Sequence, residues 1–150
     1  MSRFAQNTSV PVERSRAEIE RTLLKYGALK FGTWSEPGRA LIQFELKAGR
    51  SIQIPLPLPV VGQPKVTGSY PKWSEKDAEQ ETRRRWRVLL LTLKALLEGV
   101  ESKLMTIDQA FLAYVVVPGT ARTIGDQLIP KLDALYAGTW NPQMLLGDGR

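Results

Sequence analysis

The sequence predicts an α+β fold: an N-terminal helix, a three-stranded antiparallel β-meander, then a long helix and two shorter C-terminal helices. Apolar residues recur at helical spacing before residue 27 and after residue 74, whereas they alternate with polar residues over 28–56. Turns that contain glycine separate the alternating runs. Hydrophobic residues make up 43% of the chain and charged residues 24%, as in globular domains. We therefore expect one domain over 13–138, with a flexible lead-in (1–12) and an irregular tail (139–150).

The first helix is expected to open at Ser15. Ser15 and Glu18 have the spacing of a capping box, in which each side chain satisfies a free backbone N–H of the first turn. One helical face then carries Ile19, Leu23 and Tyr26. Gly27 stands where a left-handed residue commonly ends a helix.

The meander is predicted by apolar residues at every second position. Leu29, Phe31 and Thr33 form the first such run. The second run is Ala40, Ile42, Phe44 and Leu46, and the third is Ile52, Ile54 and Leu56. Turns at Pro37-Gly38 and Ala48-Gly49 join the runs into hairpins. Prolines at 55, 57 and 59 lack an N–H and are expected to end the third strand or hold it at an edge.

Residues 57–74 are predicted to form a long Pro/Gly-rich loop that leads into the long helix. Trp73 is expected to pack against the start of that helix, and Ser74 to cap it. The helix should cover 75–103. Its apolar stripe consists of Ala78, Trp86, Leu89, Leu90, Leu93, Leu97 and Val100. This stripe can pack either on the sheet or on a second copy of the chain.

Two shorter helices are expected after the long one. Thr106 opens the first, Tyr114 is expected to face inward, and Pro118-Gly119 should end it. Thr123 opens the second, which Pro130 should interrupt or kink and Gly138 should close. Its inward-facing residues are expected to be Ile124, Leu128, Leu132 and Leu135.

The residue inventory excludes several kinds of chemistry. The chain has no cysteine, which excludes disulfides and thiolate metal sites, and no histidine, the commonest general base and metal ligand. No motif for a cofactor or a phosphate-binding loop is present, so we expect no cofactor, no metal and no enzyme. A carboxylate-dependent nuclease stays open as an alternative, with Asp77 and Glu81 one helical turn apart.

The charge is unevenly distributed along the chain. Residues 1–74 hold eleven Lys or Arg and five Asp or Glu, and residues 75–150 hold ten of each, so the whole excess of +6 lies in the first half. Such asymmetry favours a polyanionic partner, and basic sheets with aromatic side chains are common platforms for single strands. The candidate nucleic-acid-binding residues are Lys30, Arg39, Lys47 and Arg50, then Arg84, Arg87, Trp34 and Tyr70.

Each feature also has a structural interpretation. The run Arg83-Arg84-Arg85-Trp86-Arg87 can form ion pairs with Glu79 and Glu81, one turn earlier, while Trp86 joins the core. The alternative function is a protein-interaction module, such as an inhibitor of a host defence or transcription protein. Its contact surface would be the long helix or the apolar tail residues Trp140, Met144, Leu145 and Leu146. A homo-oligomer also stays open.

Several segments resemble a family of small, mostly uncharacterised proteins of tailed phages and prophages. The segments are 12–23, 25–28, 54–57, 84–90, 94–101, 111–112 and 123–125. The most distinctive is Arg84-Arg85-Trp86-Arg87-Val88-Leu89-Leu90. The genes of this family lie near replication and recombination functions, so the resemblance implies a phage accessory protein that binds nucleic acid, with single-stranded DNA favoured.

No membrane segment is expected, because the longest apolar run, Val88–Leu93, is far too short to cross a bilayer. The first residues, 1–16, also lack the apolar core of a signal peptide. With the resemblance to phage proteins, this predicts a location in the cytoplasm of a bacterial host cell.

Overall fold

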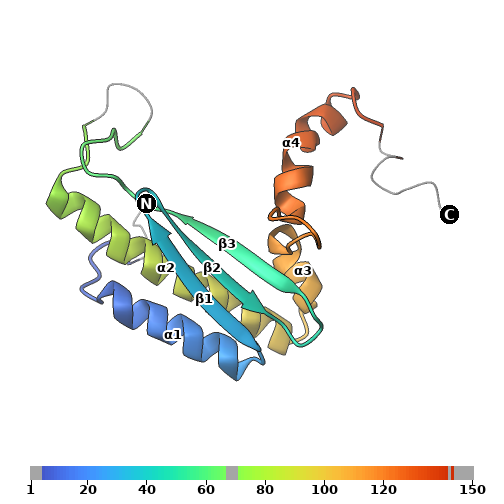
Figure 1. The fold of residues 1–150 in the computed structure, drawn as a ribbon, viewed down its shortest axis with the longest axis horizontal. Coiled ribbons are helices and arrows are strands. Elements are labelled where there is room, and N and C mark those ends of the chain that lie inside the picture. Colours follow the sequence, from blue (N-terminus) through green and yellow to red (C-terminus); the bar gives the residue numbers. More distant parts are fainter. Residues whose placement is uncertain (1–4, 67–70, 142, 144–150) are drawn as a thin grey trace.

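The computed structural model describes residues 5–66, 71–141 and 143, and it has the expected α+β architecture. Helix α1 (Val12–Lys25) is followed by strands β1 (Lys30–Glu36), β2 (Arg39–Glu45) and β3 (Ser51–Pro57). Then come α2 (Glu75–Glu101), α3 (Ile107–Phe111), the 3-10 helix η1 (Leu112–Tyr114) and α4 (Ile124–Tyr136). Figure 1 shows α1 and α2 beside one face of the sheet, with α4 projecting away from it. Tyr70, Met144, Leu145 and Leu146 lie outside the described residues.

The expected start of the first helix was wrong. Helix α1 begins three residues before Ser15, and the amides of Arg14 and Ser15 donate to the carbonyl of Pro11. The side chain of Ser15 is fully buried, and its Oγ has no hydrogen-bond partner. Apolar packing of this face therefore prevails over the local capping pattern. The expected end is correct: Gly27 has φ +96°, and Ala28 N donates to Leu23 O at 3.0 Å, which closes the helix.

The three strands form one antiparallel sheet in the order β1-β2-β3. Lys30 pairs with Glu45 at one end of the first hairpin and Glu36 with Arg39 at the other. Because side chains alternate along a strand, this register puts Ala40, Ile42 and Phe44 on a buried inner face. Leu29, expected on that face, precedes β1 and is exposed. Pro55 lies in β3, an edge strand, as expected for a residue without an N–H.

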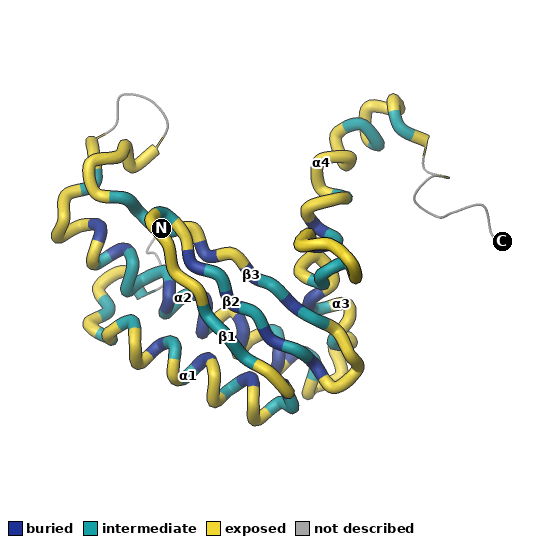
Figure 2. Tube along the Cα trace, in the orientation of Figure 1, coloured by how far each residue is buried: buried dark blue, intermediate teal, exposed yellow. Residues whose placement is uncertain are grey.

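Helix α2 supplies the other half of the core, and its apolar stripe packs on the sheet. Trp86, Leu90, Leu93 and Leu97 are almost fully buried, whereas Val100 is only partly covered. Figure 2 shows buried residues at intervals along α1, α2 and the strands. The Ser74 side chain accepts a hydrogen bond from Asp77 N, which confirms the cap. The helix ends at Glu101, two residues earlier than expected, because Lys103 adopts a left-handed conformation (φ +61°).

The loop between β3 and α2 contains more order than its composition indicated. Gly62 N donates to Trp73 O and Trp73 N donates to Gln63 O, both at 2.9 Å. Pro64 and Lys72 form a bridge beyond them, so two described parts of this loop run antiparallel as an arm. Trp73 is half-buried, with Lys65 Nζ 5.0 Å from its ring centroid.

The C-terminal helices depart from expectation in two respects. The capping boxes at Thr106 and Thr123 are both formed. The first helix, however, ends at Phe111 and gives way to η1, so Tyr114 is 37% exposed and does not face inward. Leu132, expected to be buried, is 46% exposed, because α4 packs mainly against η1. Helix α4 runs through Pro130 without interruption.

Within the described parts of the chain, no helix combines the length and the apolar character needed to cross a membrane.

Candidate nucleic-acid interface

The sheet has an outer face that neither α1 nor α2 covers. Its residues follow from the strand register: Lys30, Gly32, Trp34 and Glu36 of β1, Arg39, Leu41, Gln43 and Glu45 of β2, and Ser51, Gln53, Pro55 and Pro57 of β3. These residues are exposed or half-buried, whereas their neighbours on β2 and β3 form the core. We call this surface the outer face.

Trp34 lies on the outer face, with the far end of its indole against Gly32 of its own strand. A Cβ atom at position 32 would lie 2.8 Å from Cη2 of the Trp34 indole, closer than real side-chain contacts allow. The absence of a side chain at Gly32 therefore lets the ring rest on the strand. The ring stays 55% exposed, which is unusual for the largest apolar side chain and leaves room for a ligand to stack on it.

Polar side chains surround this tryptophan. A hollow of about 270 Å³ is lined by Trp34 together with Lys30, Gln43, Glu45 and Ser51. Gln43 Nε2 donates to Ser51 Oγ at 3.4 Å, and the amide oxygen of Gln43 is a hydrogen-bond acceptor by its chemistry. An aromatic surface beside amide and hydroxyl groups can both stack a planar ring and form hydrogen bonds with its edge.

The cations of the outer face are paired with carboxylates. Lys30 Nζ lies 3.0 Å from Glu45 Oε2, and Arg39 Nε lies 3.1 Å from Glu36 Oε1. All four side chains are at least 31% exposed, so these pairs are weak and can exchange with other ions. The outer face thus has little net charge of its own, a feature that the uneven charge along the chain did not reveal.

Two other candidate cations lie beyond the outer face, at the β2–β3 turn. Arg50 forms a two-pronged ion pair with Asp108, at 3.1 and 3.2 Å, and so ties the turn to α3. Lys47 passes close to Gly27, and its side chain is exposed. The structure therefore places Lys30, Trp34 and Arg39 on one face of the sheet, with Lys30 and Arg39 at opposite ends of the first hairpin. It separates Lys47 and Arg50 from them.

The arginine run on α2 is engaged in ion pairs, as its structural interpretation predicted. Arg85 Nε lies 3.0 Å from Glu81 Oε1, and Arg83 lies 3.6 Å from Glu79. Arg84 pairs with Glu81 as well, at 2.8 Å, and Arg87 pairs with Glu18 of α1 at 3.2 Å. Arg84 and Arg87, both binding candidates, thus lie in the helical layer and away from Trp34. Trp86 is buried, with Arg16 over its ring at 5.5 Å.

Glu81 is the most buried carboxylate of this group. Burial acts to raise the pKa of Glu81, but hydrogen bonds from Arg84 and Arg85 outweigh it and hold the pKa below the usual 4.5. The hydrogen bond to Glu81 in turn raises the pKa of Arg84. Arg85 also donates to the carbonyl of Pro57 at 2.8 Å, so the cluster fastens α2 to the end of β3.

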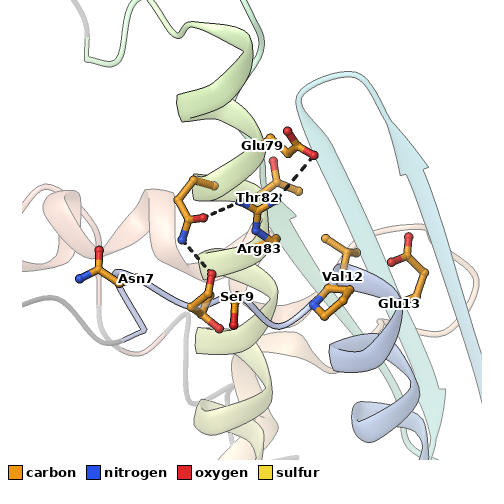
Figure 3. A pocket seen from close by; sticks show the side chains of 10 residues that line it. Asn7, Ser9, Val12, Glu13, Glu79, Thr82 and Arg83 are labelled. Atoms are coloured by element: carbon orange, nitrogen blue, oxygen red, sulfur yellow. Dashed lines mark hydrogen bonds and ion pairs between the residues drawn. The ribbon is translucent and has the colours of Figure 1, made fainter.

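A separate hollow of about 580 Å³ lies between the N-terminal segment and α2 (Figure 3). Asn7, Ser9 and Val12 line one side, and Glu79, Thr82 and Arg83 of α2 line the other. Gln80 Nε2 donates to the carbonyls of Gln6 and Thr8, at 3.2 and 2.9 Å, and holds the described part of the lead-in in place. Glu13 and Glu79 offset the charge of Arg83, so the hollow offers no excess positive charge to a phosphate.

Another cleft, of about 500 Å³, separates the outer face from η1 and α4. Its walls are Arg39, Gln53 and Pro55 on the sheet, and Tyr114, Ile129 and Pro130 opposite. The sequence missed this cleft because Tyr114 was expected to face inward. It extends the outer face and adds a second exposed aromatic ring.

Asp77 and Glu81, the carboxylates of the nuclease alternative, are both bound to cations. Lys65 Nζ lies 2.9 Å from Asp77, and its hydrogen bond lowers the pKa of Asp77. Arg84 and Arg85 hold Glu81. In the part of the chain that the structure describes, no three His, Cys, Asp or Glu residues cluster as metal ligands.

Comparisons with models of protein families, with curated proteins and with solved structures find no match to this chain.

Proposed function

We propose that the protein binds single-stranded nucleic acid on the outer face of the sheet, without catalysing a reaction. The observation that supports this most directly is the exposed indole of Trp34, which rests on Gly32. Base stacking on such a ring is worth about 1–3 kcal/mol per base and tolerates any sequence. Duplex DNA keeps its bases stacked on one another, so an aromatic platform of this kind favours single strands.

The neighbouring residues complete the proposed site. Lys30 and Arg39 flank Trp34 and would exchange their carboxylate partners for phosphates of the strand. Gln43 and Gln53 offer amide groups to base edges. Tyr114 in the adjoining cleft gives a second ring on which a base can stack.

The two cations of the proposed site set the expected dependence of the binding constant on salt concentration. Each phosphate contact of a single strand contributes about −0.7 to the slope of log K against log salt concentration. Two contacts, from Lys30 and Arg39, therefore predict a slope of about −1.4. A far steeper slope would place the binding on a different set of cations.

Fluorescence anisotropy with labelled single- and double-stranded oligonucleotides tests the proposal. The unmodified protein should bind the single strand more tightly, and Trp34→Ala should weaken this binding by about tenfold or more. Tyr136→Ala is a matched control, because it removes an aromatic ring that is 90% exposed on α4, away from the sheet. Unchanged binding by Trp34→Ala, or no binding at low salt, would contradict the proposal.

Arg50 is a poor choice for such a test, although the sequence placed it in the site. Arg50 already forms a two-pronged ion pair with Asp108 of α3, so its removal changes a contact between the β2–β3 turn and α3 as well as the charge. As the biological setting we propose phage replication or recombination in the bacterial cytoplasm, which the sequence resemblance supports.

A second candidate function is a protein-interaction module, and the exposed face of α4 favours it. Ile129, Leu132 and Tyr136 are 59%, 46% and 90% exposed on this projecting helix. The apolar stripe of α2 is buried under the sheet and is not a contact surface. A host protein that co-purifies at fixed stoichiometry, and is lost in Leu132→Asp, would favour this function over the first.

A further inference from the structure

The two edges of the sheet differ in how they are protected. At the β3 edge, Pro55 and Pro57 have no N–H to offer to another strand. Near the start of β3, Ile52 forms a bridge with Val115, and Val116 N donates to Ser51 O at 2.8 Å. Prolines and a covering segment are the common means by which proteins prevent a further strand from adding.

Within the described parts of the chain, the β1 edge has neither kind of protection. Strand β1 is seven residues long, contains no proline, and pairs only with β2 among the described residues. Arg16 of α1 donates to the Thr33 side chain on the inner face, and this contact leaves the backbone of β1 available. An open strand of this length presents a row of N–H and C=O groups to any strand that can pair with it.

The sequence of β1 is complementary to itself when two copies run antiparallel. With Thr33 opposite Thr33, Lys30 lies opposite Glu36, and Gly32 lies opposite Trp34. Directly opposed residues of opposite charge stabilise an antiparallel pair, as do paired threonines. A two-fold interface makes each such contact twice.

We propose that a second copy of the chain pairs through β1, which joins the two sheets into one of six strands. The two-fold axis would pass beside Thr33. Because Lys30 already pairs with Glu45 at 3.0 Å, and Glu36 with Arg39 at 3.1 Å, the interface creates a row of alternating charge across the joined sheet. The row reads Glu45 and Lys30 of one copy, then Glu36 and Arg39 of the other.

The arrangement of Trp34 fits the same register. Its indole stays beside the strand surface, and the residue opposite it in the second copy is Gly32, which has no side chain to displace the ring. The Trp34 indole of each copy therefore stays exposed when the two strands pair. The two outer faces would form one continuous surface, but the pairing does not depend on nucleic-acid binding.

Sedimentation velocity without nucleic acid, over protein concentrations up to about 1 mM, tests the pairing. The unmodified chain should form a dimer. Lys30→Glu places Glu opposite Glu36 twice, and Glu36→Lys places Lys opposite Lys30 twice, so each variant should dimerise more weakly, on the order of tenfold. Lys76→Glu, an equal change of charge at an exposed position on α2, should leave the dimer unchanged.

Mixing the two variants separates a lost contact from a damaged fold. In the mixed pair every Glu at position 30 or 36 lies opposite a Lys, so the Lys30→Glu and Glu36→Lys chains should form a heterodimer more readily than either forms a homodimer. The double variant carries both changes and should recover self-association. A monomer at every concentration, or a mixture that forms no heterodimer, would overturn the proposal.

Discussion

The Glu81 cluster makes a measurable contribution to stability. Glu81→Gln keeps the size of the side chain but removes its charge, and its amide NH2 can no longer accept a hydrogen bond as one of the two Glu81 oxygens does. Arg84 and Arg85 then each exchange a hydrogen bond to a charged acceptor for one to a neutral acceptor, a loss of about 1 kcal/mol apiece. Both arginines are at most 30% exposed, so solvent compensates only partly. The free energy of unfolding should fall by about 2 kcal/mol.

Urea unfolding followed by far-UV circular dichroism measures this loss. At neutral pH a decrease of about 2 kcal/mol corresponds to a midpoint lower by on the order of 1 M urea. Glu79→Gln is the matched control, because Glu79 is 70% exposed and lies 3.6 Å from Arg83. Its midpoint should stay close to that of the unmodified protein, since exposed ion pairs contribute little.

The pH dependence gives a second, independent check. The pKa of Glu81 in the folded protein is below its usual 4.5, so the charged form stabilises the fold above that pH. This stabilisation is lost as the pH falls through the folded-state pKa. The difference between the unmodified protein and Glu81→Gln should therefore shrink in acid. A difference that stays constant over the acid range, or equal midpoints at neutral pH, would refute the reasoning.

Three further predictions concern single contacts. Gly27→Ala should lower the free energy of unfolding by about 1 kcal/mol, because φ is +96° there, and urea unfolding measures it. Lys103→Gly should raise it by about 0.5 kcal/mol in the same assay by relieving a left-handed backbone; a decrease would contradict this. Arg50→Gln should speed amide hydrogen exchange in α3, since it loosens the tie to Asp108, with exchange in α1 as the internal reference.

The parts of the fold that the sequence predicted are those in which a repeating pattern extends over many residues. The alternation from Ala40 to Leu46 allows only one choice of inner face, and the Pro37-Gly38 turn fixes the register with β1. The apolar stripe of α2 is similarly long. The start of α1 was mistaken because two residues at capping distance are a weak signal beside a buried helical face.

The candidate site was predicted less completely, since it depends on contacts between distant segments. Lys30, Trp34 and Arg39 share a face because strand alternation places them there. The pairing of Arg50 with Asp108 joins residues far apart in the chain, and no local pattern predicts it. The exposure of Tyr114 has the same origin: Val115 bridges to Ile52 and ends the helix that would have turned the ring inward.

The four tryptophans are distributed over four different parts of the molecule. Trp34 lies on the outer face, Trp73 on the arm, Trp86 in the core and Trp140 after α4, where Lys131 lies 5.5 Å from its ring. The indole emission of this chain is therefore a sum of four local signals, each of which reports on one region. The fluorescence of variants that retain a single tryptophan would show whether these regions unfold together or one after another.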